Sequence, residues 1–159
     1  MSAQTSYTRN QPRAYAGLIY DLAPKEVVSF AVETVAGIDF GVAVSRGTDK
    51  EKQVVIGGTD FAGIAIRSME REGVNSGAIS YSEKETAGIM RMGKIYAVCP
   101  TGCNPGDAVN YVNATGVLDS GAAVAGETQI DGAIWDSVTT AGELGVIRLD
   151  GNLSTTAGA

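Results

Sequence analysis

The fold is decided by residues 86–118, which read TAGIMRMGKIYAVC (86–99), PTGCNPGD (100–107), AVNYV (108–112), NATG (113–116) and VL (117–118). In the first run Ile89 and Ile95 fall on one face of an extended chain and Tyr96 on the other, with Gly93 at the only break. This period of two predicts a strand. The Pro, Gly, Asn and Asp residues that follow preset turn dihedrals before an extended run resumes. The stretch therefore predicts strands joined by turns, as in a β meander.

The rest of the chain repeats this pattern on a smaller scale. Its 159 residues fit one domain, and its 21 glycines supply the positive φ angles that tight turns need. Further alternating or apolar runs lie at 17–20, 28–33, 38–45, 53–56, 61–66, 128–135 and 144–149. We read 118–127 as a Gly- and Ala-rich loop and 67–85 as a long surface loop. An all-β chain is expected.

Charge and hydropathy exclude two classes of partner. With 12 basic and 18 acidic residues the net charge is −6, and no cluster of Lys or Arg offers the positive surface that nucleic acid requires. No apolar run is long enough to span a bilayer, and residues 1–6 lack the basic and apolar parts of a signal peptide. We expect neither a nucleic acid nor a membrane partner, and folding in a cytosol.

The residue types restrict the possible chemistry. The chain has no histidine, which removes Ser-His-Asp and Cys-His nucleophiles and every histidine-containing metal site. Cys99 and Cys103 are too few for a zinc site. In a reducing compartment they are expected to be structural thiols, although the sequence leaves open whether they ever form a disulfide. No phosphate-binding loop or EF-hand is present. The prediction is no cofactor and no metal ion.

Carboxylates remain as catalytic candidates only by elimination. A pair of them can hydrolyse a glycosidic bond when the two flank the sugar. Acidic residues in turns, however, ordinarily cap and solubilise those turns, so we predict no catalytic residue. The four candidates are Asp119, Glu127, Asp131 and Asp136.

Two further features concern interaction surfaces. Residues 1–16 are polar and carry Tyr7, Arg9, Arg13 and Tyr15. They form either an untied terminus or an arm ordered against a partner, since Tyr and Arg are frequent at interface hot spots. Trp135 fits a core or an interface, and we favour the core.

The order of segments resembles that of a known family. The segments are GLIYD (17–21), IDFGVAV (38–44), FAGIA (61–65), GKIYA (93–97), PGDAV (105–109), GAIW (132–135) and GVIRL (145–149). Together they resemble the structural cement, or head decoration, proteins of tailed bacteriophages. The resemblance implies a single small β-barrel or jelly-roll-like domain over 17–149. An extended N-terminal arm (1–16) would precede it and a flexible C-terminal tail (150–159) would follow it.

The resemblance also implies a function. It predicts a non-enzymatic cement protein, made in the bacterial host cytoplasm, that binds the outer surface of an icosahedral phage head and stabilises contacts between major capsid subunits. Its partners would be the major capsid protein and further copies of itself, as a homodimer or homotrimer. The candidate contact residues are Tyr7, Arg9, Arg13, Tyr15 and Tyr20.

Two other functions remain open on the sequence. The chain could be a β-domain that recognises glycan or a host surface through exposed aromatics such as Tyr7, Tyr15 and Tyr20. A carboxylate hydrolase using Asp131 or Asp136 is the third hypothesis.

Overall fold

The computed structural model describes residues 14–68 and 80–159, and within them the chain forms strands and no helix. The predicted all-β class is confirmed. No helix capable of crossing a membrane occurs in these two ranges. The strands are β1 (Glu26–Val32), β2 (Ile38–Asp39), β3 (Ala43–Arg46), β4 (Gln53–Ile56), β5 (Phe61–Ala65), β6 (Ser80–Tyr81), β7 (Thr86–Cys99), β8 (Ala108–Val112), β9 (Leu118–Ser120), β10 (Glu127–Trp135) and β11 (Glu143–Ala157).

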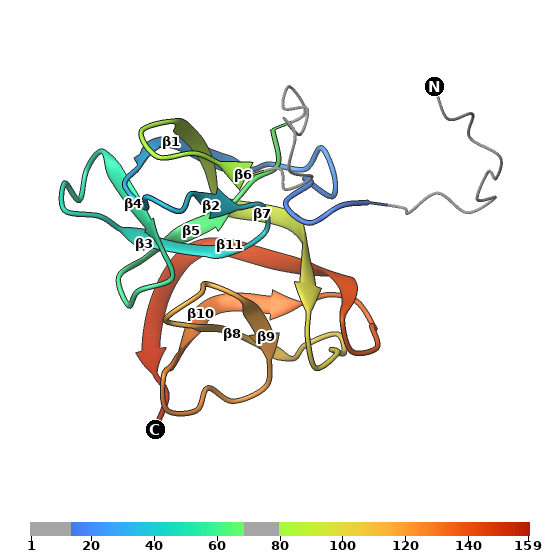
Figure 1. The fold of residues 1–159 in the computed structure, drawn as a ribbon. Helices are drawn as coiled ribbons and strands as arrows, with labels where there is room; N and C mark the ends of the chain where they lie inside the picture. The colour runs from blue at the N-terminus through green and yellow to red at the C-terminus, as the bar shows by residue number, and fades with distance from the viewer. Residues whose placement is uncertain (1–13, 69–79) are drawn as a thin grey trace, which may run out of the picture.

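Five strands close into a barrel. Their order is β1-β4-β3-β5-β7, and an additional pairing of β1 with β7 joins the two ends. Only β1 and β4 run parallel; the other neighbours in this ring are antiparallel. The barrel occupies the upper part of Figure 1. Of the two forms expected from the sequence, the structure shows the barrel.

The second half of the sheet is built on the same long strand. From β7 the order continues as β11-β10-β8-β9, and these strands fill the lower part of Figure 1. The predicted meander is therefore wrong, because β11 and β10 lie between β7 and β8. The loop after β7 does not turn straight back, since Cys103 forms a bridge to Thr139 in the loop that follows β10. In this half of the sheet, β8 pairs with β9 and β10 pairs with β11 as sequence neighbours.

Gly93 marks the point where β7 changes partners. Residues 86–92 of β7 pair with β1, and residues 92–99 pair with β11. Gly93 has φ +121°, and a Cβ there would lie 3.0 Å from the Cβ of Lys25. A residue with a side chain rarely adopts this conformation. The break seen in the sequence therefore corresponds to a bend that only glycine supplies without strain.

The core consists of two clusters, one of barrel residues and one centred on β7, β8, β10 and β11 that also takes in Ala43 of β3 and Ile64 of β5. Trp135 is fully buried in the second cluster, and its Nε1–H donates to the carbonyl oxygen of Asp119 at 3.0 Å. Gly145 lies directly against its ring, because a Cβ at Gly145 would be 2.7 Å from Cζ3. The prediction that Trp135 packs in the core is confirmed.

Three local predictions are wrong. The run 38–45 is not one strand, because a turn at 40–41 separates β2 from β3 and Gly41 there has φ +76°. The loop expected over 67–85 contains β6, which pairs with β2. The loop expected over 118–127 begins with β9, which pairs with β8. β6 and β9 have two and three residues, too few to show a period of two in the sequence, whereas the alternation over 38–45 continued through the turn.

The C-terminal segment belongs to the sheet. β11 continues past Leu149 to Ala157, where Ile130 pairs with Thr155 and Thr128 pairs with Ala157. A separate tail from residue 150 is therefore wrong as far as Ala157. The reason is that β10 extends back to Glu127 and offers backbone partners to this segment, whereas its small polar side chains gave no apolar pattern.

Candidate functional site

Residues 14–20, here called the arm root, are bonded to the second half of β7. The N–H of Gly17 donates to the carbonyl oxygen of Tyr96 at 2.8 Å, and the N–H of Tyr96 donates to that of Leu18 at 2.9 Å. The N–H of Tyr20 donates to the carbonyl oxygen of Lys94 at 2.9 Å. Ala14 is only 4% exposed. The arm root is therefore held against the domain by backbone hydrogen bonds and by the burial of Ala14.

Tyr20 is held within a cluster of aromatic and charged groups. Its ring lies 5.4 Å from the ring of Tyr96 between centroids, and the Nζ of Lys94 lies 5.6 Å from the Tyr20 centroid. The same Nζ lies 2.7 Å from Oδ2 of Asp136, and this hydrogen bond raises the pKa of Lys94. Tyr20 remains 48% exposed, so part of its ring is free to contact a partner.

The ring of Tyr15 is packed against an arginine side chain. The guanidinium carbon of Arg67 lies 4.9 Å from the ring centroid of Tyr15 and 5.2 Å from that of Phe40. The backbone N–H of Arg67 also donates to the carbonyl oxygen of Gly17 at 2.7 Å. Tyr15 is 52% exposed. The sequence did not single out Arg67, because it looked like the first residue of a charged surface loop.

Two of the five predicted contact residues lie in the arm root, and each is packed against a different cation. Tyr15 and Tyr20 both belong to the arm root, whereas Tyr7, Arg9 and Arg13 lie outside the described residues. We define the arm-root surface as Tyr15, Tyr20, Arg67, Lys94, Tyr96, Asp136 and Val138.

Two open hollows are lined in part by residues of the arm root. The larger has a volume of about 650 Å³ and is lined by Ala14, Tyr20, Tyr96 and residues of the loop between β10 and β11. In that loop Val138 is 73% exposed. A smaller hollow of about 260 Å³ includes Ala16. The arm-root surface is therefore uneven, with aromatic and apolar side chains beside the ion pair of Lys94 and Asp136.

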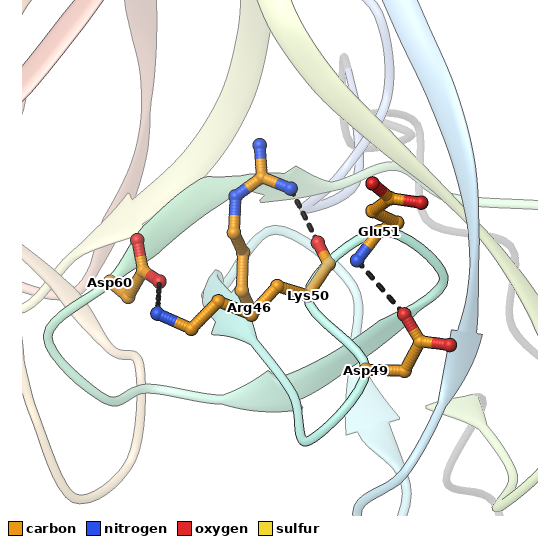
Figure 2. Close-up of polar contacts among 5 residues, drawn as sticks. All are labelled: Arg46, Asp49, Lys50, Glu51 and Asp60. Atoms are coloured by element: carbon orange, nitrogen blue, oxygen red, sulfur yellow. Dashed lines mark hydrogen bonds and ion pairs between the residues drawn. The ribbon is translucent and has the colours of Figure 1, made fainter.

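The charged loop between β3 and β4 is a second exposed region (Figure 2). Nη1 of Arg46 donates to the carbonyl oxygen of Lys50 at 2.6 Å, and Nζ of Lys50 lies 3.1 Å from Oδ2 of Asp60. The N–H of Glu51 donates to Oδ1 of Asp49 at 3.1 Å. The polar groups of this loop are satisfied within the loop and by Asp60. Because exposed ion pairs add little stability, we interpret the loop as a solvated turn.

The four carboxylate candidates each have a partner of another kind. Oδ1 of Asp119 accepts from Thr101, Oε2 of Glu127 accepts from Asn110, Oδ2 of Asp131 accepts from Ser154 and Thr156, and Oδ2 of Asp136 pairs with Lys94. The carboxylates of Asp119 and Asp131 accept hydrogen bonds from hydroxyl groups, and these bonds stabilise a loop and a pair of strands. A search of residues 14–68 and 80–159 found no group of three or more Cys, Asp or Glu able to hold a metal ion.

Both cysteines are free thiols in the core. Cys99 is fully buried and Cys103 is 2% exposed. Burial raises the pKa of the Cys99 thiol. Sγ of Cys103 donates to the carbonyl oxygen of Ser137 at 3.3 Å. Both cysteines are thus buried free thiols, as expected from the sequence.

Comparisons with known proteins agree on the kind of protein. The family model described as "Structural cement protein (E217 gp24/Pam3 gp6)" matches residues 3–150. A solved structure titled "The capsid of Myoviridae Phage XM1" contains a chain with a TM-score of 0.74 and 17% sequence identity. That alignment covers 94% of this chain and 98% of the other, so the two share a fold. A search of curated proteins found no match.

Proposed function

This chain belongs to the phage structural cement protein family, and from that membership we propose that it binds the outer surface of an icosahedral phage head and stabilises contacts between major capsid subunits. The family match carries the proposal, since it spans residues 3–150 and so includes both halves of the sheet. A cement protein of this kind is a non-enzymatic structural component of the virion, made in the cytoplasm of the host.

The arm-root surface, with the arm that precedes it, is the face we assign to the major capsid protein. Tyr15 and Tyr20 are half exposed, yet each ring already lies against a cation, from Arg67 and Lys94 respectively. Side chains fixed before binding lose little conformational entropy when they are covered. Tyrosine and arginine are also the residue types that dominate interface energetics.

A single arm-root surface need not bind tightly. The protein is expected to act as a homodimer or homotrimer, and linked copies bound to one head gain avidity beyond any single contact. Copies that also contact one another on the head would hold the capsid subunits together better than copies that bind singly.

Co-sedimentation with expanded heads that lack this protein tests the proposal. We expect the unmodified protein to sediment with the heads and to raise the temperature at which they open. Tyr20→Ser should weaken binding about tenfold or more, because truncating a hot-spot tyrosine costs about 2 kcal/mol or more and about 1.4 kcal/mol corresponds to a factor of ten. Val124→Ser, which changes an exposed side chain outside the arm-root surface, is the matched control. Failure to bind heads at any salt concentration would exclude the function.

Removal of residues 1–13 separates the arm from the domain. The arm root keeps its hydrogen bonds to β7 in this variant, so we expect a folded protein with weaker head binding. Loss of the folded circular dichroism spectrum would instead assign the arm a structural role. Full head binding by a folded variant would show that the arm makes no capsid contact.

The larger hollow supports the second candidate, a glycan-binding domain. Tyr20 and Tyr96 line it together with the carboxylate of Asp136 and the hydroxyl-bearing loop of Ser137 and Thr139, and aromatic faces beside polar groups suit ligand recognition. A glycan array decides between the two functions. Saturable sugar binding by a protein that does not sediment with heads would replace the cement function.

A further inference from the structure

The last part of β11 is paired on one side only. Residues Ser154–Ala157 pair with β10, and the pairing with β7 stops at Asp150. Within the described part of the chain no strand pairs with the other side of residues 151–157. This half of β11 runs along the outside of the sheet toward the C-terminus in Figure 1.

The alternation of hydrogen-bonded pairs between β10 and β11 shows which backbone groups of β11 point away from β10. The N–H of Gly158 donates to the carbonyl oxygen of Glu127 at 2.9 Å. Because antiparallel residues alternate between facing and turning away from a neighbour, Ser154 and Thr156 face β10. Thr155 and Ala157 then turn their N–H and C=O groups outward. Both residues are exposed.

The edge formed by β9, in contrast, is in contact with a loop. The hydroxyl of Ser120 donates to the carbonyl oxygen of Gly102 at 2.5 Å, and the N–H of Thr101 donates to Oδ1 of Asp119. The loop after β7 therefore covers β9. In the barrel, the pairing of β1 with β7 closes the ring. Of the three edges compared, only the distal half of β11 has neither a paired strand nor a covering loop on its outer side within the described residues.

This edge also lacks the usual protection against pairing. Residues 151–157 read GNLSTTA, with no charge and no proline, whereas exposed edges are commonly blocked by lysine, proline or inward charges. Gly132 and Gly151, with φ +82° and +86°, form the irregularity where β11 leaves β7. The carboxylate of Asp131 on β10 accepts hydrogen bonds from the hydroxyls of Ser154 and Thr156. These bonds keep the charge of Asp131 beside β10 and β11.

We propose that this edge pairs with the same edge of a second copy, antiparallel across a two-fold axis near Thr155, so that the two sheets become continuous. Such a contact is self-complementary, because each copy offers the donors and acceptors that the other needs. A chain of net charge −6 repels its copies generally, and an uncharged edge is where two copies approach at least cost. The inference stands independently of capsid binding.

Sedimentation velocity of the full chain over a range of concentrations tests the pairing. We expect a species of about twice the 16.3 kDa mass to grow with concentration. Thr155→Pro removes an outward donor and keeps the bonds to β10, so it should weaken association about tenfold or more. Thr156→Ala, which leaves the edge backbone intact, should associate normally.

Amide hydrogen exchange provides a readout that needs no variant. Exchange at Thr155 and Ala157 should slow as concentration rises, while exchange at exposed Val35 should not change. A monomer at every concentration with fast exchange at both amides would overturn the pairing, even if Thr155→Pro failed to fold. Protection of these amides only on phage heads would assign the edge to the capsid protein and would also overturn it.

Discussion

Replacing Gly145 by alanine tests whether the position of Trp135 is set by the absence of a side chain on β11. The added Cβ would lie 2.7 Å from Cζ3 and 2.9 Å from Cε3 of Trp135, and 3.2 Å from Sγ of Cys103. Ordinary carbon contacts are about 3.5–4.0 Å, so the overlap with the ring approaches about 1 Å. The indole cannot withdraw freely, because it is fully buried and hydrogen bonded to Asp119.

Overpacking of this kind typically costs about 1–3 kcal/mol, and the fixed ring places Gly145→Ala in the upper part of that range. For a domain of this size the midpoint of thermal unfolding should fall by roughly 4–10 °C. Urea unfolding followed by circular dichroism measures the free energy directly. Arg148→Ala, an exposed change on the same strand, should stay within about 0.5 kcal/mol of the unmodified protein.

A double-mutant cycle gives the decisive result. Trp135→Phe alone should destabilise the protein, since it removes the hydrogen bond to Asp119 and leaves a cavity. It also removes the outer part of the ring that the new methyl group would strike. The combined loss should therefore be smaller than the sum of the single losses by about 1 kcal/mol or more. Losses that add within about 0.5 kcal/mol would refute the steric explanation.

Three further predictions follow from described contacts. Gly93→Ala should lower the free energy of unfolding by about 1–3 kcal/mol in denaturant titrations, because φ +121° is strained for a residue with a side chain; an unchanged midpoint would contradict this. Cys99 and Cys103 should react with a thiol reagent at neutral pH only after unfolding, since both are buried and burial raises the pKa of Cys99; rapid labelling of the folded protein would disprove it. Hydrogen bonds from Thr48 lower the pKa of Glu33, so the stabilisation is present above the unfolded pKa and is lost as pH falls through the folded pKa. Glu33→Gln should therefore reduce stability at neutral pH and have a smaller effect in acid, as measured by thermal unfolding across pH, and an equal effect at both would contradict the linkage.

The parts of the fold that the sequence predicted are those with a regular period over enough residues. β7 and β10 were recognised because alternation continues over nine residues or more. The predicted meander order was wrong, because strand order depends on contacts between distant loops, such as the bridge from Cys103 to Thr139. The distal half of β11 was missed because its pairing is made by the backbone, and its side chains need no apolar face.

The candidate site was predicted in part for a similar reason. Tyrosines near the N-terminus suggested an interface, and in the structure Tyr15 and Tyr20 are both about half exposed on the arm root. The cations that hold them, Arg67 and Lys94, come from later segments. Nothing in local spacing connects a tyrosine to an arginine about fifty residues away, so only the folded chain reveals the cluster.

The sharing of β7 between the two core clusters has a consequence for how the molecule comes apart. The first half of β7 gives Ala87 and Ile89 to the barrel cluster, whereas Met90 and the second half of the strand belong to the other cluster. Neither cluster can lose this strand without exposing the other, so heat or denaturant should melt both in one cooperative transition. Assembly has the same requirement in reverse, because every ring closure waits for pairings between distant segments. Slow folding is the expected cost of this arrangement.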